Sequence, residues 1–424
     1  MLKKKIRVLM FGWELPPHYG GGLGIACNGL AMQMVGCGAD ITFVLPKKIQ
    51  VDAKYMKVVF ANVKEFINKG VAQSVVDLLR SSYIRPENYK SLREETFGFC
   101  REEIFHGTLF EEVLEYGCLA ENIFLQEDFD IIHIHEWLCV PCGINAKRKS
   151  GKPLVFHVHA TEFDRSGGTG VDQRVYEIEK AGLEEADRVI ALSHRMKNIL
   201  VQNYGINEGK ISVVHNGVDK SHLSGFGKTS NKLQALKRGG NKIILYAGRL
   251  TIQKGVDYFL KAANKVLKTE KKVFFLIVGS GDMERQLIMQ AAEMGISDKV
   301  FFTGWLKGAE LFESYSISDL FVMPSVSEPF GLNPLELMML GKPVIISKQS
   351  GVSEAVFHAL KVDFWDVDEM ANKIIAITKY KSLSSQLSDF GKKEVKHVSW
   401  KEAAKKCISV YQELLSDKQN CAND

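Results

Sequence analysis

The sequence lacks a long apolar segment, which excludes a membrane span from its organisation. The longest stretch without Asp, Glu, Lys or Arg is 15–39, and it is rich in glycine. A membrane-spanning helix needs about 20 consecutive, mostly apolar residues, so this stretch is a poor candidate. Residues 1–5 lead directly into a strand-like run at 6–11, without an apolar signal region or a small-residue cleavage site. We therefore expect a cytoplasmic protein.

Cysteine and excess charge are also scarce. The 8 cysteines among 424 residues are mostly scattered, which favours reduced thiols over a disulfide framework. Cys139 and Cys142 have the spacing of a redox pair at a helix start, but buried thiols are the favoured interpretation. The net charge of +5 suits a phosphorylated substrate and is too small to indicate nucleic-acid binding. The composition and length predict a soluble globular protein of two or three domains.

Short aliphatic or β-branched runs alternate with longer amphipathic runs along the chain. Several of the short runs are apolar at consecutive positions, as strands buried on both faces must be. This alternation predicts right-handed crossovers and two open parallel sheets, which is an α/β fold. The predicted strands are 6–11, 41–45, 131–134, 154–158, 188–192 and 211–214 in the first half, and 242–247, 273–278, 300–303, 320–323 and 344–347 in the second.

Two segments interrupt the alternation. Residues 220–241 are polar and enriched in glycine, serine and lysine, which predicts an interdomain linker. Residues 47–122 are less regular and rich in helix formers, and we interpret them as an insertion near the cleft between domains. The predicted organisation is a first domain over 1–218 and a second domain over 241–395.

The segment after the apolar run 319–323 carries the clearest functional signal. Asn333 is a suitable N-cap, Pro334 fits the first helical position, and Glu336 completes a capping box. Gly341 then closes the helix. The sequence therefore predicts a short helix whose amino-terminal amides point out of the sheet edge.

The start of that helix is predicted to bind an anion. Its first amides point toward Gly331 and Leu332, where unpaired N–H groups and the positive end of the helix dipole favour negative charge. Glu328 and Glu336 flank this point with seven residues between them. A phosphate site flanked by carboxylates suits a nucleotide that also carries hydroxyl groups. The alternative is that Glu336 only caps its own helix.

Two cations follow the first predicted strand of the second half. Arg249 and Lys254 lie five residues apart in the loop after 242–247. Fixed cations at a strand end can neutralise a diphosphate and the charge that develops on it. The alternative is a solvated loop. This loop and the segment 328–336 end two strands of one sheet and complement each other chemically, which favours the functional interpretation.

A glycine-rich turn at 20–24 follows the first strand and precedes a helix. Because glycine has no Cβ atom, the backbone of such a turn can approach a phosphate or sugar closely. A dinucleotide-binding fingerprint would also require an acid at the end of the next strand. That strand ends Val44-Leu45-Pro46-Lys47, without an acid, so an NAD site is not favoured.

Two His-x-His pairs end neighbouring predicted strands. His133 and His135 share one face of the first strand, and His157 and His159 share one face of the second. Together with Glu136 they offer a possible metal site. The alternative is one site histidine and several packed ones. Ligand crevices lie outside the carboxyl ends of strands, which favours His135, Glu136 and His159 as site residues.

Taken together, these stretches resemble the retaining glycosyltransferases of the two-Rossmann (GT-B) architecture over most of the chain. The Gly-Arg-Leu…Lys-Gly motif at 248–255 and the Glu-x7-Glu motif at 328–336 are specific in combination. Gly21-Gly22-Leu23-Gly24 and His135-Glu136-Trp137 look most like bacterial glycogen synthases, although Tyr19-Gly20 replaces the usual lysine and Glu136 the usual aspartate. The resemblance implies two Rossmann-like domains facing across a cleft. It also implies a carboxy-terminal helix, 396–424, that returns to the first domain.

The resemblance further implies a role for each matching residue. Arg249 and Lys254 would hold the donor diphosphate, and Glu336 would bind ribose hydroxyls. The residues assigned to catalysis contact the departing diphosphate or the transferred sugar: His159, Arg249, Lys254 and Glu328. The residues assigned to substrate binding belong to the same motifs: Gly21, Gly22, Leu23, His135, Glu136, Gly248, Phe330, Gly331, Leu332 and Glu336. No metal and no other cofactor is expected.

The expected function is transfer of a hexose to an α-1,4-glucan, as in glycogen synthase. Glucose is the favoured sugar, with UDP-glucose or ADP-glucose as the donor. One alternative within this class is transfer to a small or lipid-linked acceptor for cell-envelope polysaccharide. Two alternatives lie outside this class. One is a metallohydrolase that uses the His-x-His pairs, and the other is a sugar-nucleotide-binding regulator. The complete set of Arg, Lys and Glu side chains argues against the regulator, because binding alone does not require a sugar-facing group. The expected partners are a nucleotide sugar and a saccharide acceptor, with no nucleic acid.

Overall fold

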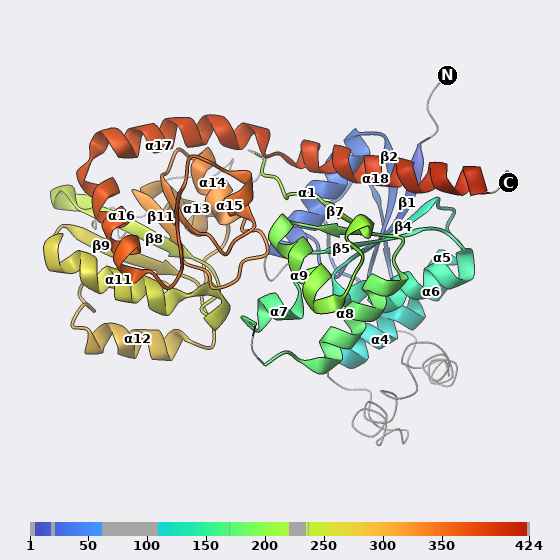
Figure 1. Cartoon of the computed structure of the whole chain (residues 1–424), viewed down its shortest axis with the longest axis horizontal. Helices are drawn as coiled ribbons and strands as arrows, with labels where there is room; N and C mark the ends of the chain where they lie inside the picture. Colours follow the sequence, from blue (N-terminus) through green and yellow to red (C-terminus); the bar gives the residue numbers. More distant parts are fainter. Residues whose placement is uncertain are drawn as a thin grey trace, which may run out of the picture.

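The computed structural model describes residues 5–17, 22–61, 109–168, 170–219, 235 and 237–421. They form two domains that lie side by side, each built on a parallel sheet (Figure 1). The expected fold class, α/β with two Rossmann-like domains, is confirmed. The predicted site residue Gly21 lies outside the described residues, as do 62–108 of the predicted insertion and most of the predicted linker.

The first sheet contains seven strands in the described part of the chain, in the order β3-β2-β1-β4-β5-β6-β7 and with parallel pairing throughout. The strand order reverses between β1 and β4, and ligands of such sheets bind outside the carboxyl ends of the strands at this reversal. The strands are β1 (Ile6–Phe11), β2 (Ala39–Leu45), β3 (Lys57–Phe60), β4 (Ile131–His135), β5 (Leu154–Val158), β6 (Arg188–Ala191) and β7 (Ile211–Val213).

The second sheet contains six strands among the described residues, in the order β10-β9-β8-β11-β12-β13, again all parallel. Its order reverses between β8 and β11, which therefore end side by side at the second expected ligand crevice. The strands are β8 (Lys242–Ala247), β9 (Val273–Val278), β10 (Val300–Phe302), β11 (Leu320–Met323), β12 (Val344–Ser347) and β13 (Leu360–Val362).

The strand predictions are confirmed to within two residues at each end, but the sequence pattern does not predict β3 or β13. Both lie at the edge of a sheet, where a strand pairs on one side only and needs less apolar sequence. β3 begins with a lysine inside the irregular segment 47–122, and β13 has three residues with a lysine at its centre. β3 therefore has only three consecutive apolar residues, and β13 has none, since its lysine separates its two apolar residues.

Helices cover both faces of each sheet. Alternating residues of β1 separate the two layers of the first domain: Val8 and Met10 pack toward α1 and α18, while Leu9 and Phe11 pack toward α4 and α6. The helices of the first domain are α1 (Gly22–Gly36), α4 (Leu109–Leu119), α5 (Glu121–Phe124), α6 (Val140–Ser150), α7 (Glu162–Arg165), α8 (Gln173–Glu185) and α9 (His194–Tyr204). The helices of the second domain and of the carboxy-terminal segment are α11 (Val256–Thr269), α12 (Glu284–Glu293), α13 (Gly308–Ile317), α14 (Asn333–Met339), α15 (Val352–Ala355), α16 (Val367–Lys379), α17 (Lys381–Glu394) and α18 (Trp400–Cys421).

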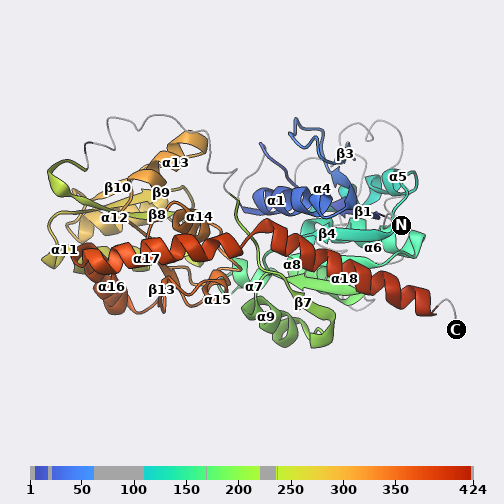
Figure 2. The same cartoon turned by 90° about the horizontal axis from the view of Figure 1, so that it is seen from above.

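The last two helices run across both domains. Figure 2 shows α17 over the second domain and α18 continuing over the first, where it packs on α1. The indole of Trp400 fills the space above Gly29, at which a Cβ atom would lie 2.6 Å from the indole nitrogen. The chain passes between the domains near residue 218 and again near residue 398. These two segments are in contact, since the Val218 amide donates to the carbonyl oxygen of Val398 at 3.0 Å. A Cβ at Gly217 would lie 2.1 Å from the backbone of Ser399, so only glycine allows this approach.

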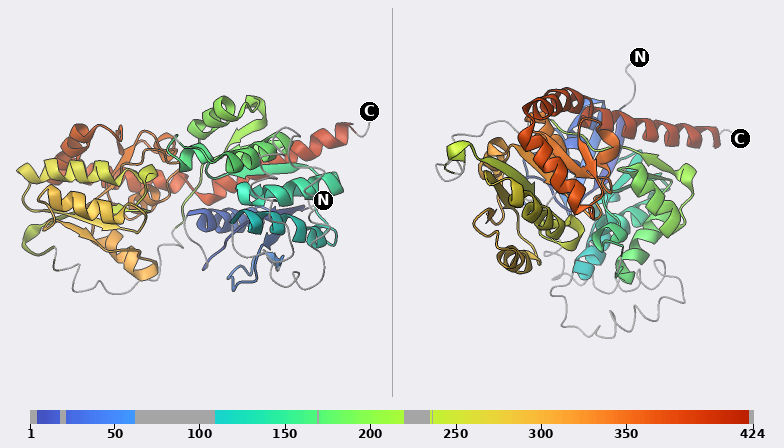
Figure 3. Two further views of the ribbon diagram at one scale, coloured as in Figure 1. Left: turned by 90° about the horizontal axis from the view of Figure 1, so that it is seen from below. Right: turned by 60° about the vertical axis from the view of Figure 1, so that its left-hand side comes forward.

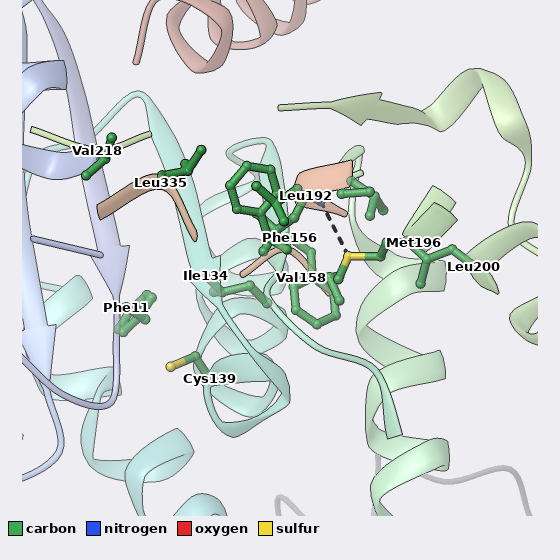
Figure 4. Close-up of a cluster of buried hydrophobic side chains, with 14 of the residues drawn as sticks. Phe11, Ile134, Cys139, Phe156, Val158, Leu192, Met196, Leu200, Val218 and Leu335 are labelled. Carbon is green, nitrogen blue, oxygen red and sulfur yellow. Dashed lines mark hydrogen bonds between the residues drawn. The ribbon is translucent and has the colours of Figure 1, made fainter. Parts of the chain in front are cut away.

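The apolar core is continuous between the domains. One cluster of buried side chains includes Phe156 and Leu192 of the first domain together with Leu335 and Phe330 of the second. Figure 4 shows part of this cluster, including the Leu192 amide and the Met196 sulfur that accepts its hydrogen bond. Further views show the two domains arranged end to end along the long axis (Figure 3). A shared core places the strand ends of the two domains close to each other.

Two expectations from composition are tested by the structure. None of the described helices is both long enough and apolar enough to cross a bilayer. Cys139 and Cys142 are buried and free, and burial raises the pKa of both thiols well above the usual range. Buried, protonated thiols are poor nucleophiles, so the interpretation of this pair as packed residues is confirmed.

Candidate active site

The loops that end β8 and β11 lie against each other at the reversal point of the second sheet. The side-chain amide of Asn333, at the start of α14, donates to the carbonyl oxygen of Ala247, the last residue of β8, at 2.9 Å. The amide of Val326 in the second loop donates to Gln253 O in the first, also at 2.9 Å. The loop with the two predicted cations and the loop with the two predicted glutamates therefore form one surface.

The predicted cap of α14 is wrong in detail. Leu332 takes the N-cap position, and among the described residues no side chain caps this helix. Asn333 lies inside the first turn, because its amide is used for the end of β8. The carboxylate of Glu336 is bonded to Tyr315 of α13 instead of to the backbone at the helix start. The helix ends as predicted at Gly341, which has a φ of 72°.

Gly331 and Leu332 present backbone N–H groups next to this helix start. Gly331 has a φ of 99°, and a Cβ atom there would lie 3.1 Å from the sulfur of Met323, so the position requires glycine. Within the described ranges, the N–H groups of Gly331 and Leu332 have no backbone acceptor. Both residues are partly exposed. These two amides are therefore available to donate hydrogen bonds to an anion, which is what an anion site at a helix start requires.

Lys254 and Glu328 are paired in this structure. The Lys254 Nζ lies 2.7 Å from the Glu328 Oε2, and the two side chains are only 20% and 12% exposed. Ser325 Oγ also donates to the same carboxylate oxygen at 3.3 Å. Arg249, by contrast, is exposed and makes no ion pair within the part of the chain that the structure describes. One predicted cation is held in place by a carboxylate, and the other is free to reach an incoming anion.

Glu336 lies one turn into α14 and faces α13. Burial raises the pKa of its carboxyl to about 7, and the hydrogen bond from the Tyr315 hydroxyl opposes that rise. A carboxyl with this pKa changes its charge near neutral pH. Its ability to accept hydrogen bonds from ligand hydroxyls therefore depends on pH.

The predicted site histidines of the first domain touch each other. His135 Nδ1 lies 2.9 Å from His159 Nε2, and both rings are buried. Burial lowers the pKa of His159 to about 3 and the pKa of His135 well below its usual value. Both imidazoles are therefore neutral at neutral pH, and His159 acts by hydrogen bonding and not as a cation.

Glu136 holds the turn that carries His159. Its Oε1 accepts from the backbone amides of His159 at 2.7 Å and Ala160 at 2.6 Å. Its Oε2 accepts from the Arg165 Nη1 at 3.1 Å. Among the described residues Glu136 is the one non-glycine residue with positive φ, at 69°, a conformation that costs roughly 1–3 kcal/mol. The carboxylate that the sequence assigned to substrate binding is thus engaged by the protein itself.

A buried charge network supports this turn. Arg165 pairs with Glu136, with Glu162 at 3.1 Å and with Glu179. Burial raises the pKa of Glu136, and the Arg165 guanidinium opposes the rise. Because the three carboxylates are buried, although Arg165 is 29% exposed, their hydrogen bonds restrict the position of His159 more than exposed bonds would.

The two halves of the predicted site meet at several points. A Cβ on Gly22, the first residue of α1, would lie 3.8 Å from the Leu332 side chain, and Leu23 and Leu332 pack against one apolar cluster. The ring of Phe330 stacks on His215 of the first domain with centroids 5.8 Å apart. Gly248 directly follows β8, and its amide donates to the carbonyl oxygen of Val278 at the end of the neighbouring strand β9 at 3.0 Å.

Several residues that join the domains carry no clear signal in the sequence. Ser327 Oγ donates to Asp164 Oδ1 at 2.7 Å and accepts from the Arg195 guanidinium at 3.0 Å. The carboxylate of Glu354 accepts from the amides of His194 and Arg195 at the start of α9. Of these residues, only Asp164 belongs to a local sequence pattern, because Thr161-x-x-Asp164 has the spacing of a capping box. The other partners are separated by more than a hundred residues.

Comparisons with known proteins agree with this architecture. Residues 228–394 match the family model of glycosyl transferases group 1, and residues 69–222 match the model of glycosyltransferase family 4. An uncharacterized glycosyltransferase of Methanocaldococcus jannaschii is 28% identical over 417 residues, which is 96% of this chain and 98% of that protein. A glycogen synthase of Mycobacterium tuberculosis is 26% identical over 360 residues, covering 83% of this chain and 80% of that protein.

The fold is also found among solved structures. Sucrose-phosphate synthase from Thermosynechococcus elongatus superimposes with a TM-score of 0.75 over 97% of this chain and 100% of that chain, at 19% identity. The two family models fall one on each half of the chain, and the relatives match along most of its length. The chain therefore has the GT-B fold, its second half matches the group 1 glycosyltransferases, and its first half matches glycosyltransferase family 4.

Proposed function

We propose that the protein is a retaining hexosyltransferase that elongates an α-1,4-glucan with glucose from a nucleoside-diphosphate donor. The observation that carries this proposal is the surface at the ends of β8 and β11. There Lys254, exposed Arg249 and the open amides of Gly331 and Leu332 lie in adjoining loops. The similarity to a glycogen synthase over 83% of the chain supports glucose and a glucan acceptor.

The difficult step in this reaction is departure of the nucleoside diphosphate. Negative charge grows on the diphosphate as its bond to the sugar breaks, and fixed cations and amides stabilise that charge without a metal at the reacting atoms. Arg249, Lys254 and the amides of Gly331 and Leu332 supply these groups. The acceptor hydroxyl attacks from the face that the diphosphate leaves, and a phosphate oxygen takes its proton. The anomeric configuration is then retained.

The sugar is held between the two domains in this proposal. His159, neutral because of its burial, donates or accepts a hydrogen bond near the reacting carbon. Glu328 contacts the sugar, while its ion pair keeps Lys254 directed toward the diphosphate. Glu336 accepts hydrogen bonds from the ribose hydroxyls, and Gly22 brings the start of α1 close to the phosphates. Glu136 acts as a positioning residue for His159.

Product analysis tests the proposal directly. Full-length protein is incubated with UDP-glucose or ADP-glucose, with and without glycogen primer, and the products are digested with an α-1,4-specific glucosidase. We expect primer-dependent chain growth with one of the two donors, unchanged by EDTA or added Mg²⁺, because the diphosphate charge is met by side chains and amides. Absence of transfer to glucan with both donors would contradict the assigned acceptor. Loss of transfer in EDTA would contradict the metal-free mechanism.

The carboxyl of Glu336 predicts a pH dependence of donor binding. Since its pKa is about 7, it is protonated in much of the protein at pH 6 and ionised at pH 8. The carboxylate accepts two ribose hydrogen bonds, so we expect the donor KM to fall as the pH rises through about 7, with a smaller change in kcat. Steady-state kinetics across this range measure the effect.

Two variants provide the controls for this pH dependence. Glu336→Gln should raise the donor KM and remove its pH dependence, while Tyr315→Phe should shift the inflection to higher pH, because the lost hydrogen bond favoured ionisation. For stability the sign is opposite to that for binding. The raised pKa contributes stability that is complete below the ordinary value of 4.5 and is lost as the pH rises through about 7. An identical pH profile in Glu336→Gln would show that another group controls KM.

A further inference from the structure

Four imidazoles form a buried layer between the first sheet and the helices above it. They come from β4 and β5, and the register pairs His135 with His157 on the adjacent strand. The ring centroids of His133 and His135 are 4.5 Å apart, and those of His135 and His157 are 5.3 Å apart. The apolar side chains around them belong to β1, α1 and α18. Polar rings are thus packed together in a layer that is otherwise hydrophobic.

Three of these rings have nitrogens without a hydrogen-bond partner in the described part of the chain. They are His133 Nε2, His135 Nε2 and both nitrogens of His157, and all are inaccessible to solvent. A buried polar group without a partner costs about 1–3 kcal/mol. Several such groups at one point form a site that a ligand could satisfy.

The remaining nitrogens of His133 and His135 are already engaged. His133 Nδ1 contacts the Tyr411 hydroxyl of α18, and His135 Nδ1 contacts His159 Nε2 at 2.9 Å. A histidine that binds a metal through one nitrogen usually has the other held by a neighbouring group, which fixes the tautomer and the ring orientation. Both rings show this arrangement, and each leaves its Nε2 for a ligand.

The positions of the three rings suit a metal ion. One ligand nitrogen from each of His133, His135 and His157 lies within 4.8 Å of the others. Zinc binds imidazole nitrogens at about 2.0–2.1 Å, so small side-chain movements bring the three into one coordination sphere.

A second cluster, Cys27 with His135 and His159, is less suitable. Its ligand atoms also lie within 4.8 Å of one another. However, His135 Nδ1 and His159 Nε2 are bonded to each other in this structure.

We propose that His133, His135 and His157 bind one divalent transition-metal ion of the zinc class. The ion links β4 to β5 beneath α18 and binds three of the four nitrogens that lack a partner in the described part of the chain, one from each ring. It is a structural ion in this proposal and takes no part in charge stabilisation at the diphosphate. The proposal is therefore independent of the proposed function and compatible with transfer that EDTA does not inhibit, since all three ligands are closed to solvent.

Metal analysis of the full chain tests the site. The protein is unfolded in denaturant with a chelator and refolded with Zn²⁺, with Co²⁺ or with chelator present. We expect about one tightly held metal ion per chain, visible absorption typical of cobalt bound tetrahedrally by three imidazoles and one water, and a higher Tm for both metal-loaded forms. A refolded protein that retains no metal after desalting, with the same Tm in all three preparations, would overturn the proposal and leave buried water as the occupant.

A substitution of His157 separates a metal site from an unsatisfied cluster. If the nitrogens are unpartnered, His157→Leu removes two costly polar atoms and should leave Tm equal or higher. If a metal is bound, the same variant should lose nearly all retained metal and have a lower Tm than the metal-loaded parent. Parental metal retention in His157→Leu would overturn the ligand assignment.

A milder variant keeps the test valid if His157→Leu does not fold. Tyr411→Phe removes only the hydroxyl that contacts His133 Nδ1, and loss of such a supporting partner typically weakens metal affinity about 10–100-fold. Tyr116→Phe is the matched control, because it removes a buried hydroxyl bonded to Val44 O in the same domain. Equal metal affinities in the two tyrosine variants would count against His133 as a ligand.

Discussion

Replacing Lys254 or Arg249 with alanine is expected to lower kcat by about 10²–10³-fold, which is the effect of removing one group that stabilises the transition state. The reason is that charge on the departing diphosphate grows only as the bond to the sugar breaks. Part of each contact already exists in the bound donor, so KM should rise as well. Initial rates with the active nucleotide sugar, at several donor concentrations, give both constants.

The control for this pair is Lys261→Ala. Lys261 also forms an ion pair in the second domain, with Asp257 at 2.9 Å, but it is 43% exposed and lies on α11. Its removal should leave kcat within about twofold, since surface ion pairs contribute little. Lys254→Ala also leaves Glu328 without its partner, so Tm is measured beside the kinetics. Near-parental kcat and KM in both Lys254→Ala and Arg249→Ala would show that the diphosphate binds elsewhere.

Replacing Glu136 with alanine is expected to lower the free energy of unfolding by about 3–5 kcal/mol, as removal of one partner from a buried charge network does. Two backbone amides, those of His159 and Ala160, would lose their acceptor, and Arg165 would lose one of its three carboxylates. Relief of the positive φ at residue 136 offsets only part of this loss. Chemical denaturation of the variant and the parent, followed by circular dichroism, measures the change in the free energy of unfolding.

Glu185→Ala is the matched control for Glu136→Ala. Glu185 pairs with Arg148 in the same domain at 2.8 Å, but both side chains are more than a third exposed. Removal of the Glu185 carboxylate should lower the free energy of unfolding by no more than about 1 kcal/mol. Glu136→Ala should also lower kcat, since His159 loses the carboxylate that positions it, while affinity for the nucleoside diphosphate alone persists. A change in stability no larger than that of Glu185→Ala would disprove the positioning role.

Local sequence patterns predicted the central strands because these strands form from residues that are neighbours in the sequence. Strands buried on both faces must be apolar at successive positions, and β8, β9 and β11 have their predicted bounds for that reason. The alternation with helices then determines the α/β class. The edge strands β7 and β10 were predicted, whereas β3 and β13 escaped prediction because β3 lies in the irregular segment 47–122 and a lysine interrupts the three-residue β13.

The cap of α14 illustrates how a distant partner overrides a local pattern. Asn333, Pro334 and Glu336 have the spacing of a capped helix start, and the helix does form there. The amide of Asn333 is nevertheless used for Ala247, which is 86 residues away in the chain. Glu336 turns to Tyr315 on a neighbouring helix. A sequence pattern cannot weigh such bonds, because the distances between their partners exist only in the folded chain.

The sequence by itself determined that this chain forms two parallel-sheet domains, and it singled out the loops that carry Arg249, Lys254, Glu328 and the helix start at 333. Only the tertiary structure decided what each side chain contacts. It paired Lys254 with Glu328, directed Glu136 to the amides beside His159, and stacked the histidines of β4 and β5 in a closed layer. The physical reason is that strand and helix periodicity depend on neighbours in the chain, whereas ion pairing, burial and the pKa depend on groups that folding alone brings together.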